Sequence, residues 1–372
     1  MDCLPEMATA IPRVVVFYMS FYWRTRDTVM VSMRRTLLGC SSALLIFMAI
    51  WSGTAVAVTR VDLYSETVEV EARDYAARLK GYQEALARVL VRSTGRRDIA
   101  NEAGIAGLVK GANRLVLQYR FLEDGRMNVS FDGPVIERFL SSNKLTLWSR
   151  ERPKTLIWLA MDNGAGARTL VGGEQAAQAK EFLEGLAQVR GMPVVFPIMD
   201  SVDMAAVPFV DVWGGFSDKV MQGSERYQPD AVLIGRALRD AAGYWSVRWS
   251  LHFDGQVQTF NGTIDDGVQV SADWFARQFA IELDSGPSRV QMHIIGIEDV
   301  EQYGRVQAYL RDLSMVRSLR VLQASADDVV FDLTLGSSLQ VLRRAMALNR
   351  TVVQVSGQAA GQDDTLYYRI GK

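Results

Sequence analysis

Three uninterrupted apolar runs in the middle of the chain constrain its fold more than any other feature. They cover Thr155–Met161, Pro193–Met199 and Ala231–Arg236, and none of them alternates between apolar and polar residues. Strands buried on both faces have this composition, and they occur in parallel sheets covered by helices. A helical pattern over about Glu174–Val189 separates the first two runs, which predicts a βαβ unit. The chain is therefore expected to contain an α/β domain.

A hairpin with strict alternation follows in the same block. Its first strand presents one apolar face made of Trp245, Val247, Trp249, Leu251 and Phe253. The Asp254-Gly255 pair predicts a two-residue turn, which sets Trp249 opposite Phe260. These aromatic side chains would also suit a stacking platform, but alternation at period two favours the core. With a helix expected around Ala272–Leu283, residues 151–286 form a predicted middle α/β domain with a mixed sheet.

The residues before this block predict an α+β domain over 58–150. A strand over Val61–Val70 precedes an amphipathic helix that ends at Gly95, a residue suited to the left-handed cap position. A hairpin then spans Arg114–Phe131, with Gly125 as the bulge of a three-residue loop. The register that puts its apolar residues on one face pairs Leu117 with Phe131, Tyr119 with Val129 and Phe121 with Met127.

The last block, residues 289–372, follows a linker at Asp284–Ser288 and reads β-α-β-β-α-β. The expected elements are Val290–Ile297, Val300–Leu313, Leu319–Gln323, Asp328–Leu335, Leu339–Leu348 and Val352–Val355. This order predicts a ferredoxin-like sandwich, a scaffold that serves many functions. Thr365–Ile370 is expected to add an edge strand. The predicted fold class is thus α/β and α+β in three small modules.

A secretory signal is predicted near the start. Met33-Arg34-Arg35 is followed by the apolar run Leu37–Trp51 and by small residues up to Ala57, which is the order of a cleavable signal peptide over 33–57. Residues 1–32 are then expected to be an artefact of start-site assignment, and the mature protein to work in a bacterial periplasm. The alternative is an uncleaved inner-membrane anchor over 37–51, although a span normally needs about 20 apolar residues.

Composition excludes several functions. The 372 residues carry 41 basic and 42 acidic side chains, a net charge of −1, so nothing predicts a nucleic-acid partner. Cys3 and Cys40 both precede the expected cleavage site, and His252 and His293 are the only histidines. The mature chain would therefore hold no disulfide, no thiol nucleophile and no cysteine ligand. We expect no metal and no cofactor.

Six sequence stretches together resemble one family of proteobacterial secreted proteins, domain of unknown function family 2066. The stretches are Glu84–Arg92 with Thr94–Arg96, Val129–Asp132, Arg152–Leu159, Arg190–Pro193 with Pro197–Asp200, Asp211–Gly214, and Arg226–Tyr227 with Asp230–Arg236. The resemblance covers roughly Val61–Arg236. It implies an exported protein to which no activity, substrate or catalytic residue is assigned.

One constellation of side chains is a candidate ligand or partner site. Asp162 and Asp200 follow the first two predicted strands, Asp203 lies just beyond, and Arg236 ends the third strand. Ligands of open α/β sheets favour the carboxyl ends of strands. The alternative is structural, with the aspartates capping the segments that follow and Arg236 in a plain ion pair. Capping is the favoured interpretation because Asp commonly has this role in such loops.

Two functional hypotheses follow. The first is a non-enzymatic periplasmic binding or scaffold protein whose partner is an envelope protein or a peptidoglycan component. The second is a periplasmic hydrolase or sugar-processing enzyme that uses Asp162 and Asp200 as an acid–base pair, which requires a suitable separation of the two carboxyl groups. No complete catalytic set is visible, so no catalytic residue is predicted and the first hypothesis is preferred.

Overall fold

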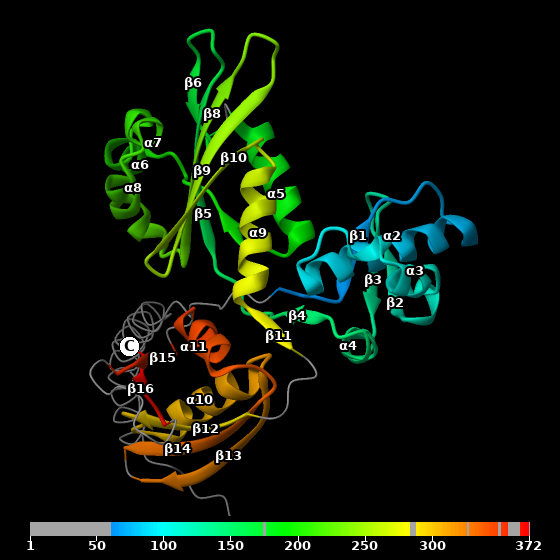
Figure 1. The fold of residues 1–372 in the computed structure, drawn as a ribbon, viewed down its shortest axis with the longest axis vertical. Coiled ribbons are helices and arrows are strands. Elements are labelled where there is room, and N and C mark those ends of the chain that lie inside the picture. The colour runs from blue at the N-terminus through cyan, green and yellow to red at the C-terminus, as the bar shows by residue number, and fades with distance from the viewer. Residues whose placement is uncertain are drawn as a thin grey trace, which may run out of the picture. The chain divides into compact units, whose positions relative to one another are not determined.

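The computed structural model describes residues 61–173, 176–282, 288–325, 327–348, 351–355 and 365–371, and the predicted signal peptide lies outside them. The chain is mixed α/β, with helices around mixed and antiparallel sheets (Figure 1). This confirms the broad fold class. Within the described residues, no helix is both long enough and apolar enough to cross a membrane.

The first block contains a three-stranded sheet in the order β1-β3-β2. Its elements are β1 (Ser65–Val68), α2 (Tyr75–Thr94), α3 (Ala103–Lys110), β2 (Val116–Phe121), β3 (Met127–Phe131), α4 (Gly133–Ser142) and β4 (Thr146–Trp148). Asp74 caps α2 by accepting a hydrogen bond from the backbone N–H of Ala77. Gly95 ends the helix at φ 74°, and a Cβ there would lie 2.2 Å from that of Ala276, so the site requires glycine on both counts.

The hairpin β2–β3 departs from its predicted register at one residue. Tyr119 pairs with Val129 and Phe121 with Met127, as predicted. Val116, not Leu117, lies opposite Phe131, so the prediction for Leu117 was wrong. An irregularity between Val116 and Gln118 adds one residue to β2, which leaves the Leu117 side chain 68% exposed.

The middle block is built on a sheet in the order β10-β9-β8-β5-β6. Its elements are β5 (Thr155–Asp162), β6 (Arg168–Leu170), α5 (Ala177–Arg190), β7 (Val194–Val195), α6 (Ser201–Ala206), α7 (Phe209–Gly214), α8 (Ser217–Ser224), β8 (Ala231–Arg239), β9 (Trp245–Phe253), β10 (Gln256–Gly262), α9 (Asp266–Gln278) and β11 (Ala280–Glu282). The buried strands β5 and β8 are parallel neighbours, and Trp249 pairs with Phe260 as predicted.

Two predicted elements of this block were wrong in extent. Of the run Pro193–Met199, only β7 pairs with β5, because β6 folds back antiparallel beside the second half of β5 and occupies that position. The helix expected up to Leu283 ends at Gln278, and the following residues form β11 instead. Strand β11 pairs with β4, and this tertiary pairing holds Ala280–Glu282 in a strand although their local sequence favours a helix.

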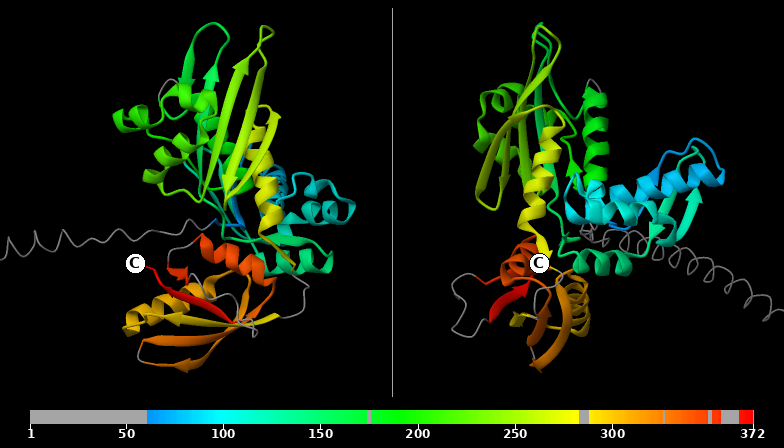
Figure 2. Two further views of the ribbon diagram at one scale, coloured as in Figure 1. Left: turned by 60° about the vertical axis from the view of Figure 1, so that its left-hand side comes forward. Right: turned by 45° about the vertical axis from the view of Figure 1, so that its right-hand side comes forward.

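Helices cover both faces of the middle sheet (Figures 1 and 2). On one face, α5 and α9 enclose a core that includes Trp249 and Phe275, both fully buried. On the other face, α6, α7 and α8 pack over the strands around Trp158. The burial of Trp249 removes the stacking-platform alternative.

The last block contains the sheet β13-β14-β12-β16-β15. Its elements are β12 (Ser288–Ile295), α10 (Val300–Asp312), β13 (Val316–Ala324), β14 (Asp328–Leu335), α11 (Leu339–Ala347), β15 (Val352–Gln354) and β16 (Leu366–Ile370). The predicted element order is present, but the two final strands are exchanged. Strand β16, expected at an edge, pairs in parallel with β12, while β15 is the edge strand. Strand β16 buries both Leu366 and Tyr368, whereas β15 buries Val352 alone, and an inner strand covers more apolar surface.

The apolar side chains of the described residues gather in clusters, one of which is shared by two blocks. One continuous cluster includes residues of the first block, such as Leu86, and residues of the last block, such as Phe331. Leu147 of β4 and Ile281 of β11 belong to the same cluster, so the paired strands β4 and β11 contribute to it. The middle block has its own clusters on the two faces of its sheet.

Candidate binding groove beside strand β1

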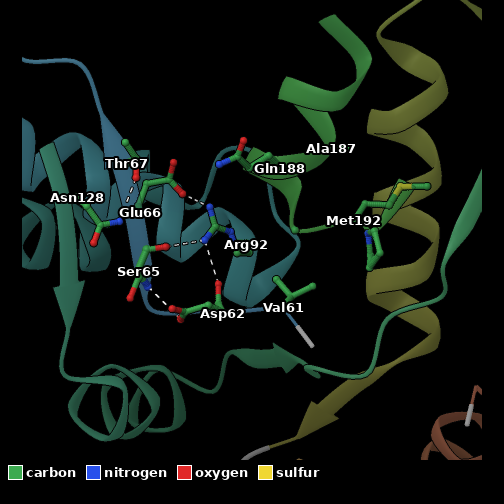
Figure 3. A pocket seen from close by; sticks show the side chains of 12 residues that line it. Val61, Asp62, Ser65, Glu66, Thr67, Arg92, Asn128, Ala187, Gln188 and Met192 are labelled. Atoms are coloured by element: carbon green, nitrogen blue, oxygen red, sulfur yellow. Dashed lines mark hydrogen bonds and ion pairs between the residues drawn. The ribbon is translucent and has the colours of Figure 1, made fainter. Parts of the chain in front are cut away.

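A recess of about 360 Å³ lies beside strand β1 and is here called the β1 groove (Figure 3). It is lined by Val61, Asp62, Ser65, Glu66, Thr67, Arg92, Asn128, Ala187, Gln188, Gly191, Met192 and Pro193. One wall is the polar edge of the first sheet, and the other is the end of α5 with the residues that follow it. Its volume falls within the range of small-ligand sites.

Strand β1 forms the polar wall because, within the described part of the chain, it is an edge strand whose one partner is β3. The N–H of Phe131 donates to the carbonyl of Tyr64, so the next carbonyl, that of Ser65, points away from β3. Arg92 reaches this outward side and donates from Nη1 to the carbonyls of Ser65 (2.8 Å) and Asp62 (3.0 Å). The open edge of the sheet therefore borders the groove.

Uncharged hydrogen-bonding side chains project from this edge. Alternation along β1 buries Glu66 and Val68 and turns Ser65 and Thr67 outward. The Nδ2 of Asn128 donates to Oγ1 of Thr67 at 3.0 Å, as Figure 3 shows. Hydroxyl and amide groups have more donor and acceptor positions than this one bond uses. The wall can thus offer both donors and acceptors to a ligand.

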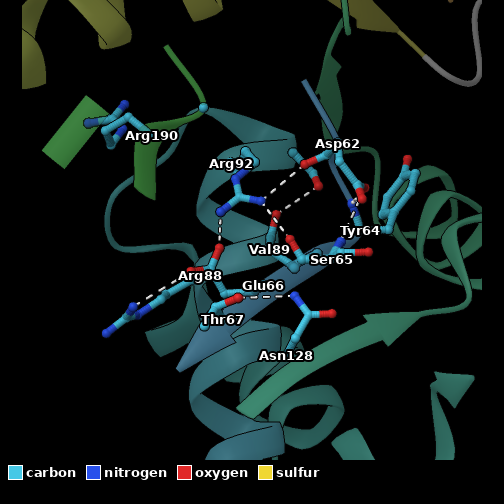
Figure 4. A network of polar contacts seen from close by, with 12 residues as sticks. Asp62, Tyr64, Ser65, Glu66, Thr67, Arg88, Val89, Arg92, Asn128 and Arg190 are labelled. Carbon is cyan, nitrogen blue, oxygen red and sulfur yellow. Dashed lines mark hydrogen bonds and ion pairs between the residues drawn. The ribbon is translucent and has the colours of Figure 1, made fainter. Parts of the chain in front are cut away.

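A buried ion pair lies at the base of the groove (Figure 4). Nη2 of Arg92 pairs with Oε2 of Glu66, and both side chains are at most 5% exposed. Arg88 approaches the other oxygen of Glu66 at 3.6 Å. Burial lowers the pKa of Arg92, and the nearby Asp62 carboxylate acts in the opposite direction. Because an arginine stays protonated in proteins, the pair contributes opposite charges that offset each other.

Two further arginines fix the opposite wall. Arg152 is buried over the ring of Trp148, with its Cζ 3.5 Å from the ring centroid. Its Nη1 donates to the carbonyls of Arg190 and Gly191, both at 3.0 Å, and its Nη2 donates to the carbonyl of Arg92 at 2.8 Å. Burial, followed by the charges of Arg92 and Arg190, lowers the pKa of Arg152 well below its usual value. One guanidinium therefore connects the ends of α2 and α5.

Arg190 makes a second connection between the same helices. It donates from Nη2 to the carbonyl of Gly95 at 2.8 Å and to Oδ1 of Asp273 at 2.6 Å. Burial lowers its pKa, and Asp273 acts in the opposite direction. The sequence interpretation missed these arginines as site-forming residues. One feature of the sequence could have identified them: each of the two helices carries an arginine in its last turn, Arg92 in α2 and Arg190 in α5.

The predicted site residues lie elsewhere, in the middle block. Asp200 is the N-cap of α6 and accepts from the N–H of Asp203, and both carboxylates bind Nη1 of Arg226 at 2.8 Å. Asp162 accepts instead from Nε of Arg168 at 2.9 Å and from the N–H of Gly164. The structure therefore brings Asp200 and Asp203 together on one arginine that the prediction did not include.

The fourth predicted residue, Arg236, has a different environment. Its Nη1 donates to the carbonyl of Trp213 at 3.5 Å. Burial lowers the pKa of Arg236, and the charge of Arg248 acts in the same direction. No contact recorded among the described residues joins Arg236 to Asp162, Asp200 or Asp203.

The electrostatics of the two candidate acids bear on the enzyme hypothesis. The hydrogen bond from Arg226 lowers the pKa of Asp200 to about 2. The hydrogen bond from Arg168 lowers the pKa of Asp162. A glycosidase-type pair needs one carboxyl group with a raised pKa as proton donor. Neither aspartate has the environment that such a donor requires.

Over the described part of the chain, no group of three or more His, Cys, Asp or Glu side chains is placed to hold a metal ion. The histidine of the last block, His293, is bound to Oδ2 of Asp328 at 2.6 Å.

Comparison with known proteins adds one match. Residues 57–149 match a family model described as a domain of unknown function (DUF8605). This confirms that the chain contains a domain of uncharacterised function, although not under the family that the motifs resemble. The matched residues include β1, Arg92 and Asn128 of the groove, but not its α5 wall. No curated protein and no solved structure matches the chain.

Proposed function

We propose that the mature chain is a non-enzymatic binding protein of the bacterial envelope that holds a peptidoglycan component in the β1 groove. The observation that carries this proposal is the lining of the groove. It combines uncharged donors and acceptors on Thr67, Asn128 and Gln188 with a buried pair, Arg92 and Glu66, whose charges offset each other. The lining also holds the Asp62 carboxylate, which accepts from the backbone N–H groups of Tyr64 and Ser65. The hydroxyl and acetamido groups of peptidoglycan sugars match the uncharged part of this lining, since each of these polar groups then finds a partner.

The proposed location rests on the sequence. The signal-peptide pattern over 33–57 would export the chain to the periplasm, where peptidoglycan lies. The resemblance to domain of unknown function family 2066, a family of secreted proteobacterial proteins, supports the same location. The division into domains 58–150, 151–286 and 289–372 belongs to this proposal. The groove is then built jointly by the first two.

The test is a titration of purified protein comprising residues 58–372 with soluble disaccharide-peptide fragments of peptidoglycan. Binding should be measured by calorimetry for the wild type and for Asn128→Ala and Thr67→Val, with melting curves to show that both variants fold. Loss of a buried hydrogen bond to a ligand weakens affinity by about tenfold for each 1.4 kcal/mol. We expect each of the two variants to bind the fragments about tenfold more weakly than the wild type.

The matched control is Gln258→Ala, which removes an exposed amide from β10 outside the groove. This variant should bind as the wild type does. Equal binding by all four proteins would place the ligand elsewhere, and failure of the wild type to bind any fragment would refute the peptidoglycan proposal. The hydrolase alternative predicts, in addition, that the fragments are cleaved on prolonged incubation.

A further inference from the structure

The second edge of the first sheet differs chemically from the β1 groove. Among the residues that the structure describes, no strand pairs with the outer side of β2, and the residues of β2 are mostly exposed. Leu117 is 68% exposed and Tyr119 is 44% exposed. An edge strand presents main-chain N–H and C=O groups that can pair with another chain. This edge, defined by β2 with the side chains around it, is here called the β2 edge.

Two arginines lie over the aromatic side chains of this edge: Arg73, which precedes α2, and Arg78, within α2. The Cζ of Arg73 is 5.0 Å from the ring centroid of Phe121. The Cζ of Arg78 is 5.8 Å from the ring centroid of Tyr119 and 5.9 Å from that of Tyr75. Within the ranges that the structure describes, neither guanidinium is recorded in an ion pair with a carboxylate. Nη1 of Arg78 donates to the carbonyl of Arg73 at 3.1 Å. Stacking holds the planes of both guanidiniums and leaves their remaining N–H groups for an anionic partner.

A recess of about 450 Å³ follows the same edge. Its lining is Tyr82, Asn113, Val116, Leu117, Gln118 and Tyr119. The ring of Tyr82 contacts that of Tyr119 edge-on, with centroids 5.6 Å apart. The recess therefore has an aromatic base, with the two stacked arginines next to it.

We propose that the β2 edge docks an extended acidic segment of a partner protein, which adds to the sheet as a fourth strand. Strand addition uses main-chain hydrogen bonds for affinity and alternate side chains for selectivity. With a two-residue period, every second side chain of the added strand would face the side of Arg73 and Arg78. Carboxylates at those positions complement the guanidiniums.

A second copy of this chain fits the edge poorly. Pairing β2 with the β2 of another molecule would bring the same arginines together, and like charges on adjacent strands are destabilising. An acidic partner removes this repulsion. The proposal is independent of the β1 groove, because β1 and β2 are opposite edges of one sheet with β3 between them.

The test uses a labelled peptide, acetyl-Glu-Val-Glu-Val-Glu-Val-amide, titrated with protein comprising residues 58–372 and followed by fluorescence anisotropy. Two control peptides replace Glu with Lys, or carry N-methyl groups on alternate residues so that strand pairing is blocked. We expect the Glu peptide to bind and both controls to bind at least about tenfold more weakly. The double variant Arg73→Gln/Arg78→Gln should lose a similar factor.

The matched control is Arg138→Gln, which removes an exposed arginine of α4 that takes no part in the β2 edge. It should bind the Glu peptide as the wild type does. Circular dichroism should show that all variants fold. The proposal is overturned if the Glu peptide does not bind at millimolar concentration, if the N-methylated peptide binds equally, or if the double variant behaves like Arg138→Gln. Binding to anionic lipid vesicles without binding to the peptide would also overturn it.

Discussion

Substituting Arg92 by methionine tests the base of the β1 groove. The change leaves the carboxylate of Glu66, whose side chain is 3% exposed, without its main partner. Removing one member of a buried ion pair typically costs about 3–5 kcal/mol, because a charge stays buried without compensation. The carbonyls of Asp62 and Ser65 lose a donor as well, but water in the groove can replace it. We therefore expect a loss of about 3–5 kcal/mol in the free energy of unfolding.

Urea denaturation at pH 7 measures this loss, and Arg88→Met is the matched control. Arg88 also approaches Glu66, but at 3.6 Å and with a side chain 35% exposed. In this control Glu66 keeps Arg92, and the close partner that Arg88 loses is the exposed Glu84. Exposed pairs contribute at most about 1 kcal/mol, so the control should change stability little. The double variant Glu66→Met/Arg92→Met should be more stable than Arg92→Met, since it buries no unpaired charge.

The pH dependence provides a second readout for Arg92→Met. An unpaired buried carboxylate takes up a proton more readily than one in an unfolded chain, so folding of the variant becomes less favourable as the pH rises. The cost should be smaller at pH 5 than at pH 7. The role assigned to the buried pair is refuted if Arg92→Met lowers the free energy of unfolding no more than Arg88→Met does, or if it lowers it equally at pH 5 and pH 7.

Three further predictions concern other parts of the chain. Trp249→Ala should destabilise the protein by about 3–5 kcal/mol because the indole is fully buried, whereas His252→Ala should leave a thermal melt almost unchanged. An unchanged melting temperature for Trp249→Ala would contradict the core position of Trp249. Asp200→Asn should destabilise the protein more at pH 7 than at pH 3. The folded pKa of about 2 lies below the unfolded value of about 3.9, so this stabilisation is present above about pH 3.9 and is lost as the pH falls toward and through 2; urea melts at both pH values check the difference. Periplasmic protein should begin at Val58 and contain no cysteine, and an intact mass that includes Leu37–Trp51 would instead indicate a membrane anchor.

The strands of the middle block were predictable where a local pattern determined them. Apolar continuity identified β5 and β8, and the Asp-Gly turn fixed the register of β9 and β10. The prediction failed where two segments compete for the same neighbour. Pro193–Met199 is as apolar as a buried strand, but β6 pairs with the part of β5 that it would have needed. Local composition does not determine which of two apolar segments pairs with a given strand, here β5.

The exchange of β15 and β16 has the same origin. Val352 and Leu366 are both buried, so apolar content alone does not order the two strands. Strand β16 contributes the buried ring of Tyr368 as well, and its parallel pairing with β12 places that ring in the core. Which strand lies inside depends on the surface that α10, α11 and the sheet leave to be covered, and this is a tertiary property.

The candidate site was the least predictable part, and its chemistry explains why. Sequence reasoning sought carboxylates at strand ends, where local backbone donors are available, and the structure places Asp162 and Asp200 among such donors. The groove depends instead on guanidiniums that bind backbone carbonyls far away in sequence, as Arg152 does with Arg92 and Gly191. Any residue supplies a carbonyl, so the acceptors leave no pattern in the sequence. A buried arginine nevertheless loses its hydration on folding, and several converging carbonyls are what offset that loss. The groove walls are thus held by contacts that become visible only when the chain is folded.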